Sequence, residues 1–99
     1  MGLSDFKLLE TEFPNGVQVI LDFGKYHLSV IQNEFSYGGK QGKYEIGVFA
    51  ANDGVASGMI ELPGITDNGE TVRGWLSEID VDIVIQKLYT ITKRIPKQI

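Results

Sequence analysis

The chain has 99 residues, a mass of 11.0 kDa and a net charge of −4, because nine Lys and Arg stand against thirteen Asp and Glu. This length fits one domain over residues 1–99, and the hydrophobic (42%) and charged (22%) fractions are typical of folded and not of disordered proteins. The chain contains no cysteine, which excludes a disulfide framework, a thiol nucleophile and a thiolate metal site.

Charge and hydropathy also exclude classes of partner. The acidic balance, with a pI of about 4.8, has the wrong sign for a protein that binds nucleic acid by releasing counterions. No apolar run approaches the roughly 18 residues of a membrane span, and the start of the chain lacks the basic and apolar stretches of a secretory leader. We therefore expect a cytoplasmic protein that contacts neither nucleic acid nor membrane directly.

Three strands are predicted in the first third of the chain. Residues 7–13 lead into the turn signal Pro14-Asn15-Gly16, and residues 17–23 then alternate apolar and polar side chains with the period of a strand. Gly24 and Lys25 form a two-residue hairpin loop, after which residues 26–32 resume the alternation. Consecutive hairpins of this kind form a meander.

Two further strands are predicted beyond a loop. Residues 33–42 are rich in turn formers and have no period, so we expect a loop, and residues 43–49 alternate again as a fourth strand. After a turn around Asp53 and Gly54, residues 59–62 are predicted to form a short fifth strand that Pro63 ends.

The C-terminal segment carries the clearest helix signal. Ser77 is a favourable N-cap, and Asp80 stands three residues later at the capping-box position. Apolar residues then recur on one arc of a helix that should pack on the sheet: Val81, Val84, Ile85, Leu88 and Ile91. A basic run before Pro96 marks the end of the helix, and we expect Trp75 to anchor its start in the core.

Together these elements predict an α+β domain, with an antiparallel four- to five-stranded sheet (a meander) and one C-terminal α-helix packed on one face. One helix covers only one side of a sheet, so the other face should be polar or buried by self-association, and Ile20 and Ile31 favour self-association. Ile79 and Ile83 form a second apolar stripe, opposite the core face of the helix. Either a loop such as residues 66–75 folds over this stripe, or a homodimer partner or a target protein covers it.

The loop after the third strand contains two overlapping candidate sites. Glycine-rich loops expose backbone N–H groups to phosphates, so the candidate ligands of an anion or nucleotide are Gly38, Gly39, Lys40 and Gly42. The P-loop sequence is absent and a strand follows instead of a helix, so plain turn geometry is the alternative. Aromatic residues beside these glycines are typical of recognition surfaces. The predicted partner-binding residues are Phe35, Tyr37, Gly38, Gly39, Ile79 and Ile83.

No catalytic set can be assembled from the remaining residues. His27, the single histidine, lies in a predicted strand without partners for metal or acid–base chemistry, and we expect it to be structural or exposed. Glu10 and Glu12 share one strand face, where exposed charge deters edge-to-edge pairing. We expect neither an enzyme nor a metal or cofactor site.

Two stretches resemble small proteins encoded by tailed phages and prophages: FSYGGKQGKYEIGVF (residues 35–49) and ITDNGETVRGWLSEIDV (residues 65–81). The shared pattern is an Asn-Gly turn, a Tyr-Gly-rich loop, a Tyr-Glu strand, an Ile-Thr-Asp segment and a Gly-aromatic-Leu-Ser helix start. This chain departs from the pattern by extra residues at 51–58 and between residues 67 and 74. The resemblance implies a phage origin and a sheet-plus-helix fold, and it supplies no established catalytic residues.

These observations favour a non-catalytic phage or prophage protein that binds a host protein in the bacterial cytoplasm, in host takeover or counter-defence. An oligomeric protein that sequesters a nucleotide or another small ligand through residues 38–42 is a second hypothesis. A minor component of the virion or of its assembly is a third. The expected partner is a host protein or a second copy of the chain, with a homodimer favoured over larger assemblies.

Overall fold

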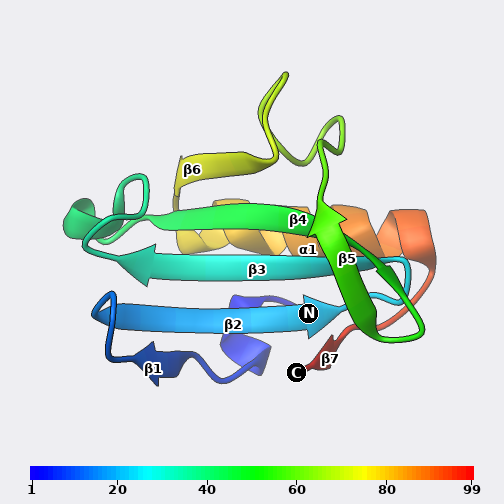
Figure 1. Ribbon diagram of the computed structural model, residues 1–99, viewed down its shortest axis with the longest axis horizontal. Coiled ribbons are helices and arrows are strands. Elements are labelled where there is room, and N and C mark those ends of the chain that lie inside the picture. Colours follow the sequence, from blue (N-terminus) through cyan, green and yellow to red (C-terminus); the bar gives the residue numbers. More distant parts are fainter.

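A seven-stranded sheet and one C-terminal helix make up the fold (Figure 1). The computed structural model describes all residues, 1–99. Five antiparallel strands follow one another as a meander: β1 (Leu9–Thr11), β2 (Gly16–Asp22), β3 (Tyr26–Asn33), β4 (Tyr44–Asn52) and β5 (Val55–Met59). β6 (Val72–Leu76) pairs with β4, β7 (Lys97–Gln98) pairs with β2, and α1 (Glu78–Thr92) lies on one face. Two short 3-10 helices are η1 (Leu3–Asp5) and η2 (Gly39–Gln41). The predicted α+β fold, an antiparallel meander with one C-terminal helix, is confirmed.

The hydrophobic core lies between the sheet and α1. Alternation places every second residue of β2, β3 and β4 on the helix side, and the register aligns these residues in rows across the sheet: Val19, Val30 and Ile46, then Leu21, Leu28 and Val48. The helix contributes buried side chains predicted for its inner face, namely Val81, Val84, Ile85 and Leu88. Ile91 was predicted on the same face but is 53% exposed, because it lies at the edge of this arc in the last turn of the helix.

The fifth strand is Val55–Met59 and not residues 59–62 as predicted. Asp53 and Gly54 both have positive φ, 51° and 80°, and such a pair forms the tight turn of a two-residue hairpin. β4 therefore extends to Asn52, and β5 begins directly after the turn.

Residues 72–76 form a strand that the sequence did not predict. β6 pairs with β4 through the partners Ile46↔Arg73 and Gly47↔Val72. Leu76 takes the buried position of this strand, so Trp75 beside it turns outward and is 60% exposed. The prediction that Trp75 anchors the helix in the core is wrong, and Leu76 fills that place.

The helix begins at the predicted cap. The Ser77 Oγ accepts a hydrogen bond from the Asp80 N–H at 3.2 Å, and the Asp80 carboxylate accepts one from the Ser77 N–H at 3.0 Å. The chain leaves the helix at Lys93, which has a φ of 57°. The N-terminus is held against the helix, because the Leu3 N–H donates to the Asp82 carboxylate at 2.7 Å.

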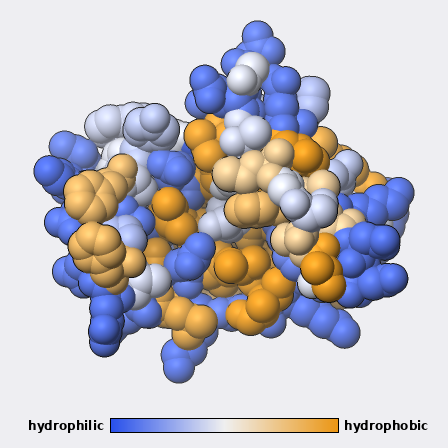
Figure 2. All heavy atoms as spheres, in the orientation of Figure 1, coloured by the Kyte–Doolittle hydropathy of each residue, from blue (hydrophilic) through white to orange (hydrophobic).

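The face of the sheet opposite α1 is partly covered by the β4–β5 hairpin, which bends across it after a bulge between Ala50 and Ala51 (Figure 1). Figure 2 shows hydrophobic residues gathered over the middle of this face, with hydrophilic residues around them. Ile20 and Ile31, for which we predict self-association, are half-buried on it.

Candidate functional site

An aromatic surface lies where the β3–β4 loop meets β6. It consists of Tyr37 and Trp75, which meet there, and of Phe35, which lies two residues before Tyr37 on the same loop. Phe35, Tyr37 and Trp75 are 71%, 59% and 60% exposed. The Trp75 N–H donates to the Tyr37 carbonyl oxygen at 3.1 Å, and both residues line one hollow of about 250 Å³. Exposed aromatic rings offer a large contact area with few rotatable bonds, which is typical of protein-recognition sites. The sequence predicted Phe35 and Tyr37 here and missed Trp75.

Side-chain hydrogen bonds hold the loop that carries Phe35 and Tyr37. The Asn33 Oδ1 accepts from the N–H groups of Phe35 and Ser36, both at 2.8 Å. The Ser36 hydroxyl accepts from the Asn33 N–H at 2.9 Å. The Tyr37 N–H donates to the Glu45 carboxylate of β4 at 2.8 Å. The aromatic surface is therefore carried on a fixed backbone.

Two glycines allow the loop and β6 to approach each other closely. A Cβ atom on Gly74 would lie 2.2 Å from the Tyr37 Cβ, and one on Gly38 would lie 3.0 Å from the Trp75 ring carbon Cε3. Gly38 also has a φ of 84°, which glycine adopts without strain. Larger side chains at these positions would separate Tyr37 from Trp75.

Trp75 has a left-handed backbone, with a φ of 59°. This conformation costs a residue with a side chain about 1–2 kcal/mol, and it persists only where the surroundings fix it. Here the hydrogen bond to Tyr37 and the pairing of Leu76 with Tyr44 fix it. Strained positions of this kind cluster at functional sites.

Charged groups surround the start of α1, next to the aromatic surface. Hydrogen bonds from Ser77, first from its backbone and then from its side chain, hold the pKa of Asp80 below its ordinary value, and Arg73 lowers this pKa further. Burial raises the pKa of Tyr44, and the negative charge of Glu78 adds to this effect. Arg73, Glu78 and Asp80 lie within five residues of Trp75 along the chain, so charges of both signs stand beside the aromatic surface.

The predicted anion site has few free donors. Seven N–H groups of the loop already donate to protein acceptors, those of Phe35, Ser36, Tyr37, Gly39, Gln41, Gly42 and Lys43. Gly38, Gly39 and Lys40 line the hollow, but Glu34 lines it too and would repel an anion. Gly42 does not line it, and its φ of 74° serves the turn after η2. The geometry favours plain turn structure for these glycines.

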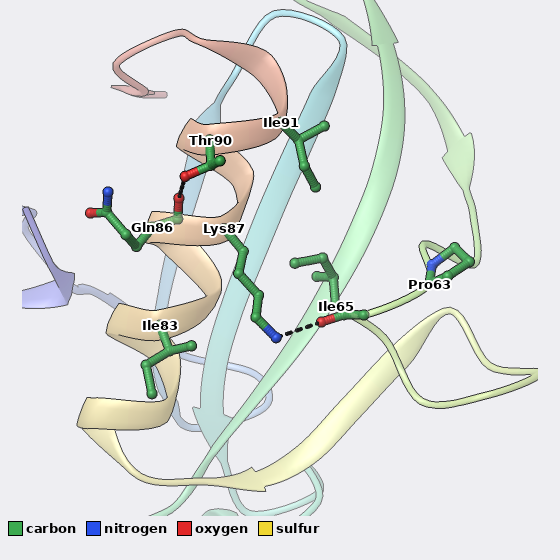
Figure 3. A pocket seen from close by; sticks show the side chains of 8 residues that line it. Pro63, Ile65, Ile83, Gln86, Lys87, Thr90 and Ile91 are labelled. Carbon is green, nitrogen blue, oxygen red and sulfur yellow. Dashed lines mark hydrogen bonds between the residues drawn. The ribbon is translucent and has the colours of Figure 1, made fainter.

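Ile79 and Ile83 form a second exposed group, on α1. They are 70% and 49% exposed, so residues 66–75 do not cover them. Ile83 lines an apolar groove of about 390 Å³ between α1 and the turn at residues 63–65 (Figure 3). The predicted partner-binding residues are thus divided between the aromatic surface and the helix.

His27 is buried in β3. Its side chain is closed off from solvent, and its Nε2 lies 3.5 Å from the Asp22 Oδ1 and has no hydrogen-bond partner. No group of three or more His, Cys, Asp or Glu side chains is arranged to hold a metal ion. The helices are too short or too polar to cross a membrane.

Comparisons with known proteins identify no relative of this chain. No protein family matches the chain, and neither a curated protein nor a solved structure matches it. The aromatic surface is defined by the geometry of this chain, and the phage origin remains a hypothesis from the resemblance.

Proposed function

We propose that this protein is a non-catalytic binding protein of a tailed phage or prophage. It engages a host protein in the bacterial cytoplasm through the aromatic surface, in host takeover or counter-defence. The observation that carries the proposal is Trp75, an indole that is 60% exposed and is held at a positive φ. The phage origin rests on the resemblance of residues 35–49 and 65–81 to small phage proteins.

An exposed and strained tryptophan has two energetic costs. The left-handed backbone costs about 1–2 kcal/mol, and the exposed ring forgoes about 1.5–3 kcal/mol that burial of a large apolar side chain contributes. A partner that covers the ring recovers the second contribution on binding. Tryptophan and tyrosine are enriched among the few residues that dominate binding energy, at about 2 kcal/mol or more each.

The rigidity of the β3–β4 loop also favours binding. Ordering a flexible loop reduces affinity, whereas Asn33, Ser36 and Glu45 already fix this one before a partner arrives. Glu34 and Lys40 at the hollow supply the charged rim that commonly encloses an apolar centre. The surface therefore has the anatomy of a small protein-binding site.

Site-specific photo-crosslinking in the bacterial host tests the proposal. A photoreactive phenylalanine analogue is placed at Tyr37 in the aromatic surface or, as a matched control, at Val55 of β5, which is 69% exposed. We expect one discrete crosslinked host protein from position 37 and not from position 55. Adding Trp75→Ala should abolish this product, because it removes the indole and leaves the probe in place.

Two results would overturn the proposal. One is that positions 37 and 55 give the same products. The other is that Trp75→Ala leaves the product from position 37 unchanged in a protein that is still folded, as judged by circular dichroism.

A further inference from the structure

The outward side of α1 carries an uncharged stripe, here called the helix crest. It consists of Ile79, Ile83, Gln86 and Thr90, which are all exposed. Their spacing of four, three and four residues is that of the seam along which two helices pack in a coiled coil. Solvent-facing helix surfaces normally carry charged residues. The crest therefore has the pattern of a helix-packing surface, and no helix of this chain lies on it.

The crest is flanked by apolar grooves on both sides. On one side Ile83 and Ile91 face the turn at residues 63–65 across the groove of about 390 Å³ (Figure 3). The Lys87 Nζ donates to the Gly64 carbonyl oxygen at 3.2 Å, which draws its charge away from the crest. On the other side a groove of about 450 Å³ is lined by Met1, Asp5, Phe6, Gln86, Tyr89, Ile95 and Pro96. Gln86 lines both grooves, so the two grooves meet at the crest.

The polar half of the crest is compatible with burial. The Thr90 hydroxyl donates to the Gln86 carbonyl oxygen at 2.9 Å, so its hydrogen is already satisfied within the helix. Gln86 is then the one crest side chain that requires a partner for its polar atoms. A single uncharged polar residue in such a seam lowers stability and fixes the alignment of the two helices.

Charges along α1 determine the direction of a self-complementary contact. The first turns carry Glu78, Asp80 and Asp82, whereas Lys93 stands at the C-cap and Arg94 follows it directly. Two parallel helices would bring their acidic starts together, whereas antiparallel helices place the acidic start of each against the basic end of the other. The helix dipoles favour the same arrangement.

We propose that α1 packs antiparallel against α1 of a second copy of this chain through the crest. The two-fold axis crosses the crest midway between Ile83 and Gln86. In this alignment Ile79 faces the partner's Thr90, and Ile83 faces the partner's Gln86. Because the contact is two-fold symmetric, each of these pairs occurs twice. The interface joins the apolar half of each crest to the uncharged polar half of the other.

The dimer gives the proposed function, on which this step rests, a second binding site. Trp75 precedes the first helical residue, Glu78, so antiparallel pairing places the two aromatic surfaces near opposite ends of the helix pair. A helix of 15 residues is about 22 Å long, which sets the scale of their separation. A host target with two equivalent sites would be bound bivalently and hence more tightly.

The oligomeric state of the purified chain is the first test. Sedimentation velocity at about 100 µM, above the micromolar dissociation constant expected for a small interface, should give twice the 11.0 kDa mass of the chain. The double variant Ile79→Asp with Ile83→Asp should sediment as a monomer, and at a concentration low enough for both proteins to be monomers its melting temperature should match that of the wild-type chain. Val55→Asp is the matched control on β5 and should remain a dimer.

Cysteine crosslinking tests the antiparallel direction, and the absence of native cysteine removes any background. Ile79→Cys and Thr90→Cys are prepared as separate proteins and oxidised alone or as a mixture. Antiparallel pairing predicts a disulfide dimer only in the mixture, because each single position lies far from its own copy across the axis.

Each contrary result would overturn the proposal. A monomeric wild-type chain at about 100 µM would show that the crest does not pair with itself. A double variant that stays dimeric would place the interface on another face, and one that unfolds would place Ile79 and Ile83 in the core. A disulfide dimer from Ile79→Cys alone would show parallel helices. None of these measurements contains a host protein. If the dimer fails, crosslinking from Tyr37 in the wild-type chain still tests the proposed function by itself.

Discussion

The Trp75 N–H donates to the Tyr37 carbonyl oxygen at 3.1 Å, and this bond joins β6 to the loop between β3 and β4. The contact brings two exposed aromatic rings to one hollow and holds Trp75 at a φ of 59°. Gly38 and Gly74 make room for it. Binding, in our proposal, depends on this junction.

The backbone strain at Trp75 can be measured by two substitutions at the same position. Trp75→Ala and Trp75→Gly both remove the ring, but only glycine adopts a φ of 59° without strain. We expect the glycine variant to be more stable than the alanine variant by about 1 kcal/mol in urea unfolding. Equal stability, or a more stable alanine variant, would show that the position is not strained.

The capping box makes stability depend on acidic pH. Hydrogen bonds from Ser77 lower the pKa of Asp80 in the folded protein, so the unfolded chain binds this proton more tightly. The stabilisation is present above the unfolded pKa of about 3.9 and is lost as the pH falls through the lower folded pKa. Asp80→Asn should therefore be less stable at neutral pH and lose less stability on acidification. Unfolding titrations of both proteins at each pH measure this, and identical acid dependence would refute it.

The glycines of the β3–β4 loop should differ in their tolerance of alanine. A Cβ on Gly39 would lie 1.8 Å from the Asn33 carbonyl oxygen, whereas one on Gly42 meets no atom within 4 Å. We expect Gly39→Ala to cost more than about 2 kcal/mol by overpacking, and Gly42→Ala about 1 kcal/mol for its positive φ. Thermal unfolding gives the comparison. A larger cost at Gly42 than at Gly39 would contradict the loop structure.

The two sides of α1 should respond differently to truncation. Leu88 is fully buried and Ile83 is 49% exposed. Leu88→Ala should cost about 2–5 kcal/mol, whereas Ile83→Ala should change the stability of the monomer by about 0.5 kcal/mol or less. The measurement is urea unfolding at a protein concentration below that of dimer formation. Similar costs at the two positions would mean that the helix faces the sheet differently.

The fold could be predicted where the signals are local. Apolar alternation identified β2, β3 and β4, and the capping pair Ser77 and Asp80 identified the start of the helix. These features depend on residues a few positions apart, so they are visible in the sequence alone.

The elements that the sequence did not predict depend on residues far away along the chain. β6 was not predicted because Val72 and Arg73 form a strand only by pairing with β4. The segment is too short to show a strand period in the sequence. Trp75 was placed in the core for the same reason, since its exposure follows from the burial of Leu76 in that strand.

The aromatic surface was half predicted. Phe35 and Tyr37 stood out as aromatic residues beside glycines. The meeting of Tyr37 with Trp75 depends on Gly74, whose only signal in the sequence is a glycine before an aromatic residue.

Native mass spectrometry of the protein purified gently from bacterial cells, beside the Trp75→Ala variant, tests the central claim most directly. We predict a complex with a host protein at a defined stoichiometry for the wild-type chain and its absence from the variant. The same bound protein on both chains would contradict the account, and so would a bound mass of nucleotide size without any host protein.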